Sequence, residues 1–150
     1  MDVSAGQTTA ALYSDGTVST VGFNGYGEGN VSDWRDIVAV ISSKCLTLGL
    51  RKNGTVAITG KENIPHSDIE SWTDVSAVFQ NGMNVYGLRA DGSVVAAGNS
   101  DYGQPEVSNW SNIVSISPGS SNVYTVGLRS DGTVRAVGVN MHGECDVSNW

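Results

Sequence analysis

Side chains that could carry out catalysis or bind a metal are few in this sequence. It contains two histidines, His66 and His142, and two cysteines, Cys45 and Cys145. Nucleophilic catalysis needs a thiol or hydroxyl beside a general base, and the nearest such pair is His142 and Cys145, three residues apart in an expected loop. Zinc needs three or four Cys or His ligands in a close set, and these four residues are dispersed. We therefore expect no catalytic residue, no metal site and no cofactor.

The residues that recur at fixed spacing are ones that shape the backbone. A turn dipeptide followed by a β-favouring pair occurs four times, beginning at Asp15, Asn53, Asp91 and Asp131. Three markers keep the same steps of 38, 38 and 40 residues: the turn glycines, the glycines six residues after them, and the four tryptophans Trp34, Trp72, Trp110 and Trp150. A fixed period of this length is the sequence signature of a repeat protein. The repeats are 1–34, 35–72, 73–110 and 111–150, in one expected domain, 1–150.

Each repeat has the pattern of a small antiparallel sheet. In the second repeat an apolar strand is expected over 36–41, and a second over 45–51, where Leu46, Leu48 and Leu50 alternate with smaller or polar residues. Alternation with a period of two indicates a strand with one buried face. Asn53-Gly54 predicts a two-residue hairpin with both central residues at positive φ, followed by a strand over 55–59. The segment 60–72 is expected to be a loop, with or without a weak outer strand.

A single sheet of three or four strands cannot bury both of its faces, so neighbouring repeats must stack. Gly49, Gly87 and Gly127 are small enough for close approach of one sheet to the next, and each tryptophan is interpreted as a wedge between repeats. Repeats of this length with three or four strands are typical of propeller blades. The predicted fold is all-β, a β-propeller of four tandem repeats. We expect an arc of a larger ring or a ring that a second chain completes, with closure of the four blades on themselves as a further alternative.

Composition and charge narrow the range of partners. The formal net charge is −7, and the eight Lys and Arg residues do not cluster. Nucleic-acid binding needs a basic stripe, and binding to anionic lipid needs basic clusters, so neither is expected. No apolar run approaches the roughly 20 residues of a membrane span. The first residues do not have the pattern of a signal peptide, so the sequence leaves the compartment open.

The motifs resemble those of a known family. Gly87-Leu88-Arg89-Ala90-Asp91-Gly92 and its counterpart 127–132 lie in one part of the repeat, and 22–28, 98–104 and 138–144 share a Gly-rich loop pattern. These segments resemble the regulator of chromosome condensation repeat family in its short bacterial form, and the propeller-type β-lactamase inhibitor proteins. The second repeat departs from the loop pattern at 60–66. The resemblance implies a propeller fold, but family members differ in function.

The resemblance also implies which loops bind. In the inhibitor proteins two loops of each blade share one binding face, and aromatic residues and Met are enriched at protein interfaces. Carried over to this sequence, the expected partner-binding residues are Asn24, Tyr26, Lys44, Met83, Asp101, Tyr102, Asn122, Met141 and His142. The predicted function is a non-catalytic protein-interaction scaffold of unknown partner, with self-association to complete a ring as a further possibility. The alternative is a propeller that binds a glycan or small ligand through its tryptophans.

Overall fold

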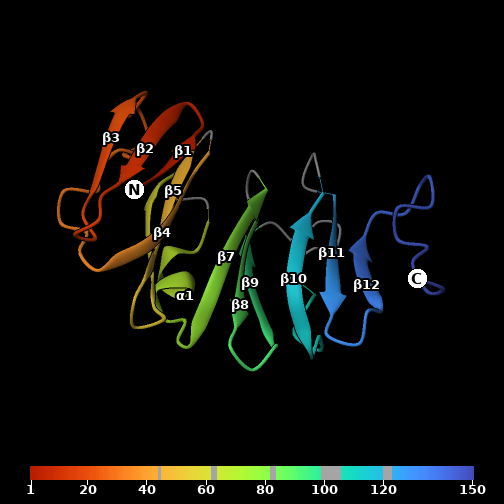
Figure 1. Ribbon diagram of the computed structural model, residues 1–150. Coiled ribbons are helices and arrows are strands. Elements are labelled where there is room, and N and C mark those ends of the chain that lie inside the picture. The colour runs from red at the N-terminus through yellow and green to blue at the C-terminus, as the bar shows by residue number, and fades with distance from the viewer. Residues whose placement is uncertain (44, 62–63, 82–83, 99–105, 120–122) are drawn as a thin grey trace. The chain divides into compact units, whose positions relative to one another are not determined.

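A computed structural model of the protein describes residues 1–43, 45–61, 64–81, 84–98, 106–119 and 123–150. The described chain forms four three-stranded antiparallel sheets, one for each repeat, which confirms the all-β prediction (Figure 1). It divides into two compact units, Met1–Val78 and Phe79–Trp150. Consecutive strands are hydrogen-bonded neighbours in every sheet, as expected for hairpin-linked blades.

The first unit holds the sheets of repeats 1 and 2. The first sheet has the order β1-β2-β3, with strands β1 (Asp2–Ala5), β2 (Thr8–Leu12) and β3 (Val18–Gly22). The second has the order β4-β5-β6, with strands β4 (Ile37–Ser42), β5 (Leu46–Arg51) and β6 (Val56–Gly60). A five-residue helix, α1 (His66–Glu70), follows β6 where the sequence predicted a loop. Its residue Ile69 is fully buried, so this segment packs through one apolar side chain and does not form an outer strand.

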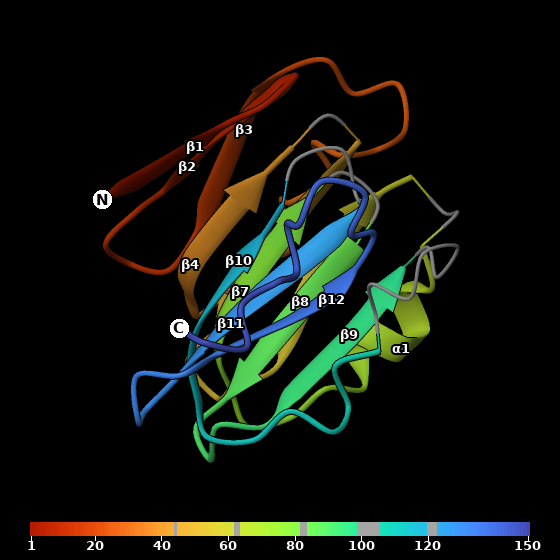
Figure 2. The ribbon, with the colours of Figure 1, turned by 90° about the vertical axis from the view of Figure 1, so that its right-hand side faces the viewer.

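The remaining sheets belong to repeats 3 and 4. The third has the order β7-β8-β9, with strands β7 (Val75–Asn81), β8 (Asn84–Arg89) and β9 (Val94–Gly98), and the boundary between the two units falls inside β7. The fourth has the order β10-β11-β12, with strands β10 (Ile113–Pro118), β11 (Tyr124–Arg129) and β12 (Val134–Gly138) (Figure 2). Within the described residues, no helix has both the length and the apolar character that a membrane crossing requires.

The hairpin turns differ from the sequence prediction. In repeat 2 the Gly54 N–H donates to the Arg51 carbonyl at 2.9 Å, and the Arg51 N–H donates to the Thr55 carbonyl at 2.9 Å. Gly54 has φ 80°, whereas Asn53 is not among the residues with positive φ. The loop is therefore three residues long, a turn closed by a glycine in the left-handed region, and the predicted two-residue turn was wrong. An Asx-Gly dipeptide suits both turns, so the dipeptide alone did not distinguish them.

The aspartates of these turns are acceptors for the residues that follow. Asp15 accepts the Thr17 hydroxyl at 2.7 Å and the Thr17 N–H at 3.0 Å, and Asp131 accepts the same groups of Thr133 at 2.6 and 2.9 Å. The hydrogen bond from the threonine hydroxyl is the largest cause that lowers the pKa of each carboxyl, and the backbone hydrogen bond lowers it further. In repeat 2, Asn53 accepts the corresponding bonds from Thr55 without a charge.

This arrangement predicts an acid-dependent loss of stability. A carboxyl with a lowered native pKa stabilises the fold above its unfolded-state pKa of about 3.9, and the contribution is lost as the pH falls through the native value. The double variant Asp15→Asn/Asp131→Asn keeps the acceptors but cannot titrate. We expect its free energy of unfolding to fall less than that of the wild type between about pH 5 and pH 2 in urea titrations. Equal losses in the two proteins would contradict the assignment.

The core of the first unit lies between the sheets of repeats 1 and 2. One buried cluster joins residues of repeat 1 to residues of repeat 2. Its members are Ala10, Leu12, Val18, Val31, Trp34, Ile37, Val40 and Ala57. Burying an aliphatic side chain contributes about 1.5–3 kcal/mol, so this seam between the two repeats is a principal source of stability. All of β5 except its last residue is buried, whereas the buried residues of β2 alternate with the exposed Thr9 and the half-buried Ala11. The central strand of repeat 2 is therefore buried on both faces, and the central strand of repeat 1 is fully buried on only one.

Main-chain hydrogen bonds also link one repeat to the next. The Ile37 N–H of repeat 2 donates to the carbonyl of the turn residue Gly16 of repeat 1 at 3.0 Å. In the second unit the Ile113 N–H donates to the Gly92 carbonyl at 3.0 Å, and the Thr125 hydroxyl donates to the buried Tyr86 hydroxyl at 2.6 Å. Burial raises the pKa of Tyr86, which keeps this phenol neutral. The turn glycines Gly16 and Gly92 thus fix the start of the blade that follows each of them.

Candidate binding loops

The loop after β3 is held by its own polar side chains. Asn24 Oδ1 accepts the Gly29 N–H at 2.7 Å, and Asn24 Nδ2 donates to Asn30 Oδ1 at 3.2 Å. The buried carboxylate of Glu28 accepts the Tyr26 N–H at 2.8 Å. These bonds satisfy main-chain donors that a loop would otherwise leave to water, so the loop has a defined shape.

The loop after β12 repeats the same bonds with different residues. Asn140 Oδ1 accepts the Cys145 N–H at 2.8 Å, and Asn140 Nδ2 donates to Asp146 Oδ1 at 2.7 Å. Glu144 Oε2 accepts the His142 N–H at 2.8 Å, and this bond is the largest cause that lowers the pKa of Glu144. The Asn and Glu of the motif therefore serve as a framework, which we call the loop frame, in both repeats.

The side chains between the frame residues are displayed to solvent. Phe23 and Tyr26 are each 50% exposed, and their rings meet edge to face with centroids 5.8 Å apart. Lys61 Nζ lies 5.6 Å from the centroid of the Tyr26 ring, within the range of a cation–π contact. In the other loop Met141 is 79% exposed and the His142 side chain 85%. Both loops thus hold large side chains outward on a fixed backbone.

The structure places four of the nine predicted binding residues. Asn24 and Tyr26 lie together in the loop of the first unit, and Met141 and His142 lie together in the loop of the second. The amide of Asn24 is occupied within its own loop, while Tyr26 is displayed. The other five lie outside the described residues: Lys44, Met83, Asp101, Tyr102 and Asn122.

Sequence reasoning did not single out Phe23, although it forms a pair with Tyr26. Phe23 directly follows Gly22, and Val139 follows Gly138 at the same place in repeat 4. An apolar residue at this fixed position of a polar loop was the available signal. It was missed because the expected binding residues were carried over from the family loop pattern, which emphasises other positions.

The residues that could do chemistry do not form a catalytic arrangement. The Cys145 thiol donates to the Val139 carbonyl at 3.5 Å, while His142 Nδ1 lies 3.2 Å from Glu144 Oε1. Burial first, and then the carboxylates of Glu144 and Asp146, raise the pKa of Cys145, which disfavours the reactive thiolate. Both cysteines are free thiols. Across the described part of the chain, no three His, Cys, Asp or Glu residues gather as metal ligands would.

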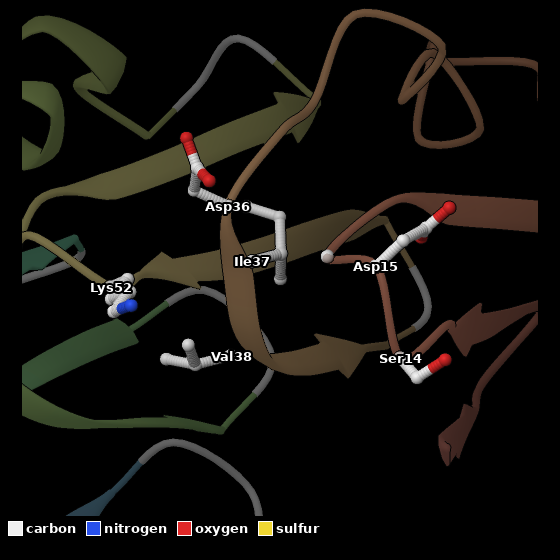
Figure 3. Close-up of a pocket in the computed structure, with 7 residues that line it drawn as sticks. Ser14, Asp15, Asp36, Ile37, Val38 and Lys52 are labelled. Atoms are coloured by element: carbon white, nitrogen blue, oxygen red, sulfur yellow. The ribbon is translucent and has the colours of Figure 1, made fainter.

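A hollow lies at the hairpin end of the first blade, opposite the loop after β3. It contains charged groups, but their side chains do not converge on one point. It has a volume of about 220 Å³ and is lined by Asp15, Asp36 and Lys52 with Ser14, Gly16, Ile37 and Val38. Figure 3 shows the two carboxylates pointing to different sides of the hollow. The hollow lies where the Ile37 N–H meets the Gly16 carbonyl, so it is part of the seam between two repeats. A catalytic site needs convergent groups, and this hollow does not provide them.

The tryptophans that suggested glycan binding have unequal positions. Trp34, Trp72 and Trp110 are buried, with 7%, 6% and 4% of their surface exposed, and Trp150 is 72% exposed. The wedge interpretation is confirmed for Trp34 and Trp110, whose rings lie against Gly49 and Gly127. Stacking on a sugar needs an open ring face, which among these four only Trp150 offers.

Solved structures of other proteins share this arrangement of sheets. Yeast RCC1 (Prp20), solved with Kap60 bound, superposes with a TM-score of 0.72 at 14% identity over 97% of this chain and 44% of that one. The chain has an RCC1-like propeller fold. The ectodomain of the receptor kinase CR4 from Physcomitrella patens matches with a TM-score of 0.70 at 20% identity, over 93% of this chain and 41% of that one. A further Prp20p structure from Saccharomyces cerevisiae gives 0.68 at 16% identity, over 93% and 44%.

The RCC1-like propeller described here thus spans less than half the length of each of these chains. At these identities the likeness concerns the fold. No protein-family model matches the sequence. No curated protein sequence matches it either.

Proposed function

We propose that this protein is a non-catalytic scaffold that binds a protein partner through the displayed side chains of its framed loops. The observation that carries this proposal is the repeated loop frame, which directs Phe23 and Tyr26 outward in one loop and Met141 and His142 outward in the other. The loops of the remaining repeats, with Lys44, Met83, Asp101, Tyr102 and Asn122, extend the proposed surface on the strength of the sequence pattern alone.

A framed loop has a physical advantage in binding. Ordering a flexible loop on association costs free energy, and a loop already fixed by internal hydrogen bonds avoids much of that cost. Tyrosine is among the residues that contribute most to protein interfaces. Methionine adapts to irregular partner surfaces. The net charge of −7 favours a partner without a strong negative charge.

The likeness to yeast RCC1 also supports the proposal that this chain binds a protein partner. Structures of that protein describe it bound to Kap60 and describe its binding to Gsp1p and histones. Because those proteins share this propeller architecture, their binding of protein partners supports protein binding as the function proposed for this chain.

The proposal predicts a selective loss of binding. In a capture experiment from a lysate of the source organism, quantified by mass spectrometry, Tyr26→Ala and His142→Ala should each reduce specific partner recovery by about tenfold, the effect of losing roughly 1.4 kcal/mol. Tyr13→Ala is the matched control, because Tyr13 is 39% exposed but lies at the hairpin end of the first blade. Far-UV circular dichroism should confirm that all three variants fold.

Two outcomes would contradict the proposal. One is recovery unaffected by both loop variants, and the other is an equal loss caused by Tyr13→Ala. A glycan array read in parallel, with titration of the tryptophan fluorescence, distinguishes the alternative, since sugar binding would quench emission through Trp150.

A further inference from the structure

The loop after β3 is joined to the second blade at a defined place. The Thr59 hydroxyl of β6 donates to the Gly27 carbonyl at 2.7 Å, so the loop lies against the end of that strand. Two residues further on, the Lys61 N–H donates to the Cys45 carbonyl at 2.9 Å. These bonds fix the backbone on both sides of the contact between Lys61 and Tyr26, whose ring centroid lies 5.6 Å from Lys61 Nζ.

The two aromatic rings of this loop meet as a corner. The Phe23 and Tyr26 rings are inclined at 69° with their centroids 5.8 Å apart, and each residue is half exposed. A Cβ placed on Gly25 would lie 2.3 Å from Cζ of Phe23, so the glycine leaves room for that ring against the backbone. The face of an aromatic ring carries partial negative charge and attracts cations. We call Phe23 and Tyr26 the ring corner, and its surface suits a cationic group better than an anionic one.

A buried carboxylate adds negative charge beside the ring corner. Glu28 is fully buried, and while its Oε2 accepts the Tyr26 N–H, its Oε1 is buried and accepts no hydrogen bond. In repeat 4 the equivalent Glu144 uses both oxygens, since its Oε1 lies 3.2 Å from His142 Nδ1. Tyr26 stands at the position of His142 and its side chain has no nitrogen to offer. A buried anion without a partner is costly, so the loop of repeat 1 favours a positive charge brought to it from elsewhere.

Lys61 is the cation that the second repeat supplies, and it is held loosely. Its Nζ lies near the outer limit of about 6 Å for a cation–π contact. Its ammonium forms no ion pair with any carboxylate among the described residues. A surface contact of this kind contributes little to stability, so a second cation can take the place of Lys61 over the Tyr26 ring at small cost.

A hollow beside Phe23 argues against a sugar at this place. It has a volume of about 290 Å³ and is lined in part by Thr8, Thr20 and Asn24. The Thr20 hydroxyl donates to the Gly29 carbonyl at 2.9 Å, the Thr8 hydroxyl donates to the Phe23 carbonyl, and the Asn24 amide is used within the loop frame. A ligand recognised by its hydroxyl groups needs polar groups placed to meet it, and these three side chains are already engaged. Charge is therefore what the ring corner offers to a ligand.

We propose that the ring corner binds a cationic side chain of the protein partner, an arginine or a lysine, which replaces Lys61 over the Tyr26 ring. Three observations carry the assignment: the inclined and half-exposed rings, the unpartnered oxygen of the buried Glu28, and the loosely held ammonium that already occupies the Tyr26 face. The net charge of −7 favours the same kind of partner. This inference rests on the proposed function of the loop and names the chemistry that the loop recognises.

The test titrates the full chain with Nα-acetyl-arginine amide and with the citrulline derivative of the same shape, in which a neutral urea replaces the guanidinium. The ring signals of Phe23 and Tyr26 are followed by NMR at constant ionic strength and are assigned with Phe23→Leu and Tyr26→Leu. We expect a saturable shift of both rings with the arginine derivative. The citrulline derivative should bind more weakly by a factor of about two to five, the contribution of one exposed cation–π contact.

Two substitutions test the charges beside the ring corner. Lys61→Met removes the competing ammonium and keeps an unbranched side chain, so the arginine derivative should bind about two to five times more tightly. Glu28→Gln keeps an acceptor for the Tyr26 N–H but removes the negative charge, so the arginine derivative should bind more weakly. Tyr13→Leu is the matched control, because Tyr13 is 39% exposed at the hairpin end of the first blade, and its replacement should leave the affinity unchanged.

Equal affinity for the two derivatives, or a Lys61→Met protein that binds the arginine derivative no more tightly, would overturn the cation site. If Tyr26→Ala lowers partner recovery while the ring corner shows no preference for arginine, the proposed function stands and this inference is wrong. If the preference for arginine is present and Tyr26→Ala leaves partner recovery unchanged, the cation site stands and the proposed function is wrong.

Discussion

Replacing Trp110 by alanine should lower the free energy of unfolding by about 3–5 kcal/mol, the usual cost of deleting a buried aromatic side chain. Trp110 is 4% exposed and its ring lies against Gly127, so the substitution removes the wedge between repeats 3 and 4. The lost contacts cannot be recovered by collapse of the neighbours, because the backbone of β11 is fixed by its pairing on both sides. Urea unfolding followed by far-UV circular dichroism measures the change without relying on tryptophan emission.

Trp150→Ala is the matched control for this prediction. Trp150 has the same residue type, the same turn and the same place in its repeat, but it is 72% exposed. We expect a change within about 0.5 kcal/mol, as for most surface substitutions. If the two variants lost equal stability, the tryptophans would not act as wedges between repeats.

We expect Gly138→Ala to lower the free energy of unfolding about as much as Trp110→Ala does, for a different reason. Gly138 has φ 118°, a conformation that residues with a side chain rarely adopt, and its cost is about 1–3 kcal/mol. A Cβ there would also lie 2.3 Å from the Val123 carbonyl oxygen and 2.6 Å from the Tyr124 Cα. Val123 directly precedes β11 and Tyr124 is its first residue, so relief requires breaking the pairing between the start of β11 and the end of β12. We expect a total loss of about 3 kcal/mol or more, from strain and overpacking together.

Gly132→Ala separates the contribution of backbone strain from that of overpacking. Gly132 also has positive φ, at 88°, but no atom lies within 4 Å of the Cβ that the substitution adds. Its cost should be backbone strain alone, about 1–2 kcal/mol. The measurement is again the urea concentration at the midpoint of unfolding, compared between proteins whose m-values are the same. A loss at Gly138 no larger than at Gly132 would show that the close approach to Val123 is relieved without cost.

The features of this fold that could be predicted from the sequence are those that local backbone geometry sets. The repeat period was predictable because each marker meets a local need that recurs in every copy: the turn glycines take positive φ, and the tryptophans end a turn closed on a buried aliphatic residue. The loop frame followed the same motif, since Asn24 and Asn140 accept equivalent N–H groups. The turn type was not predictable, because Asn53-Gly54 suits a two-residue or a three-residue hairpin.

The amino-acid sequence by itself determined the number of repeats, their β character and the residues on which each blade is built, since short-range backbone geometry selects those residue types. Only the tertiary structure decided which of the repeated positions are covered. Trp110 and Trp150 are indistinguishable by type, spacing and local turn, yet one is buried and the other exposed. Burial depends on whether another sheet lies against a given face, and that contact is made by residues distant in the chain, outside the reach of any local pattern.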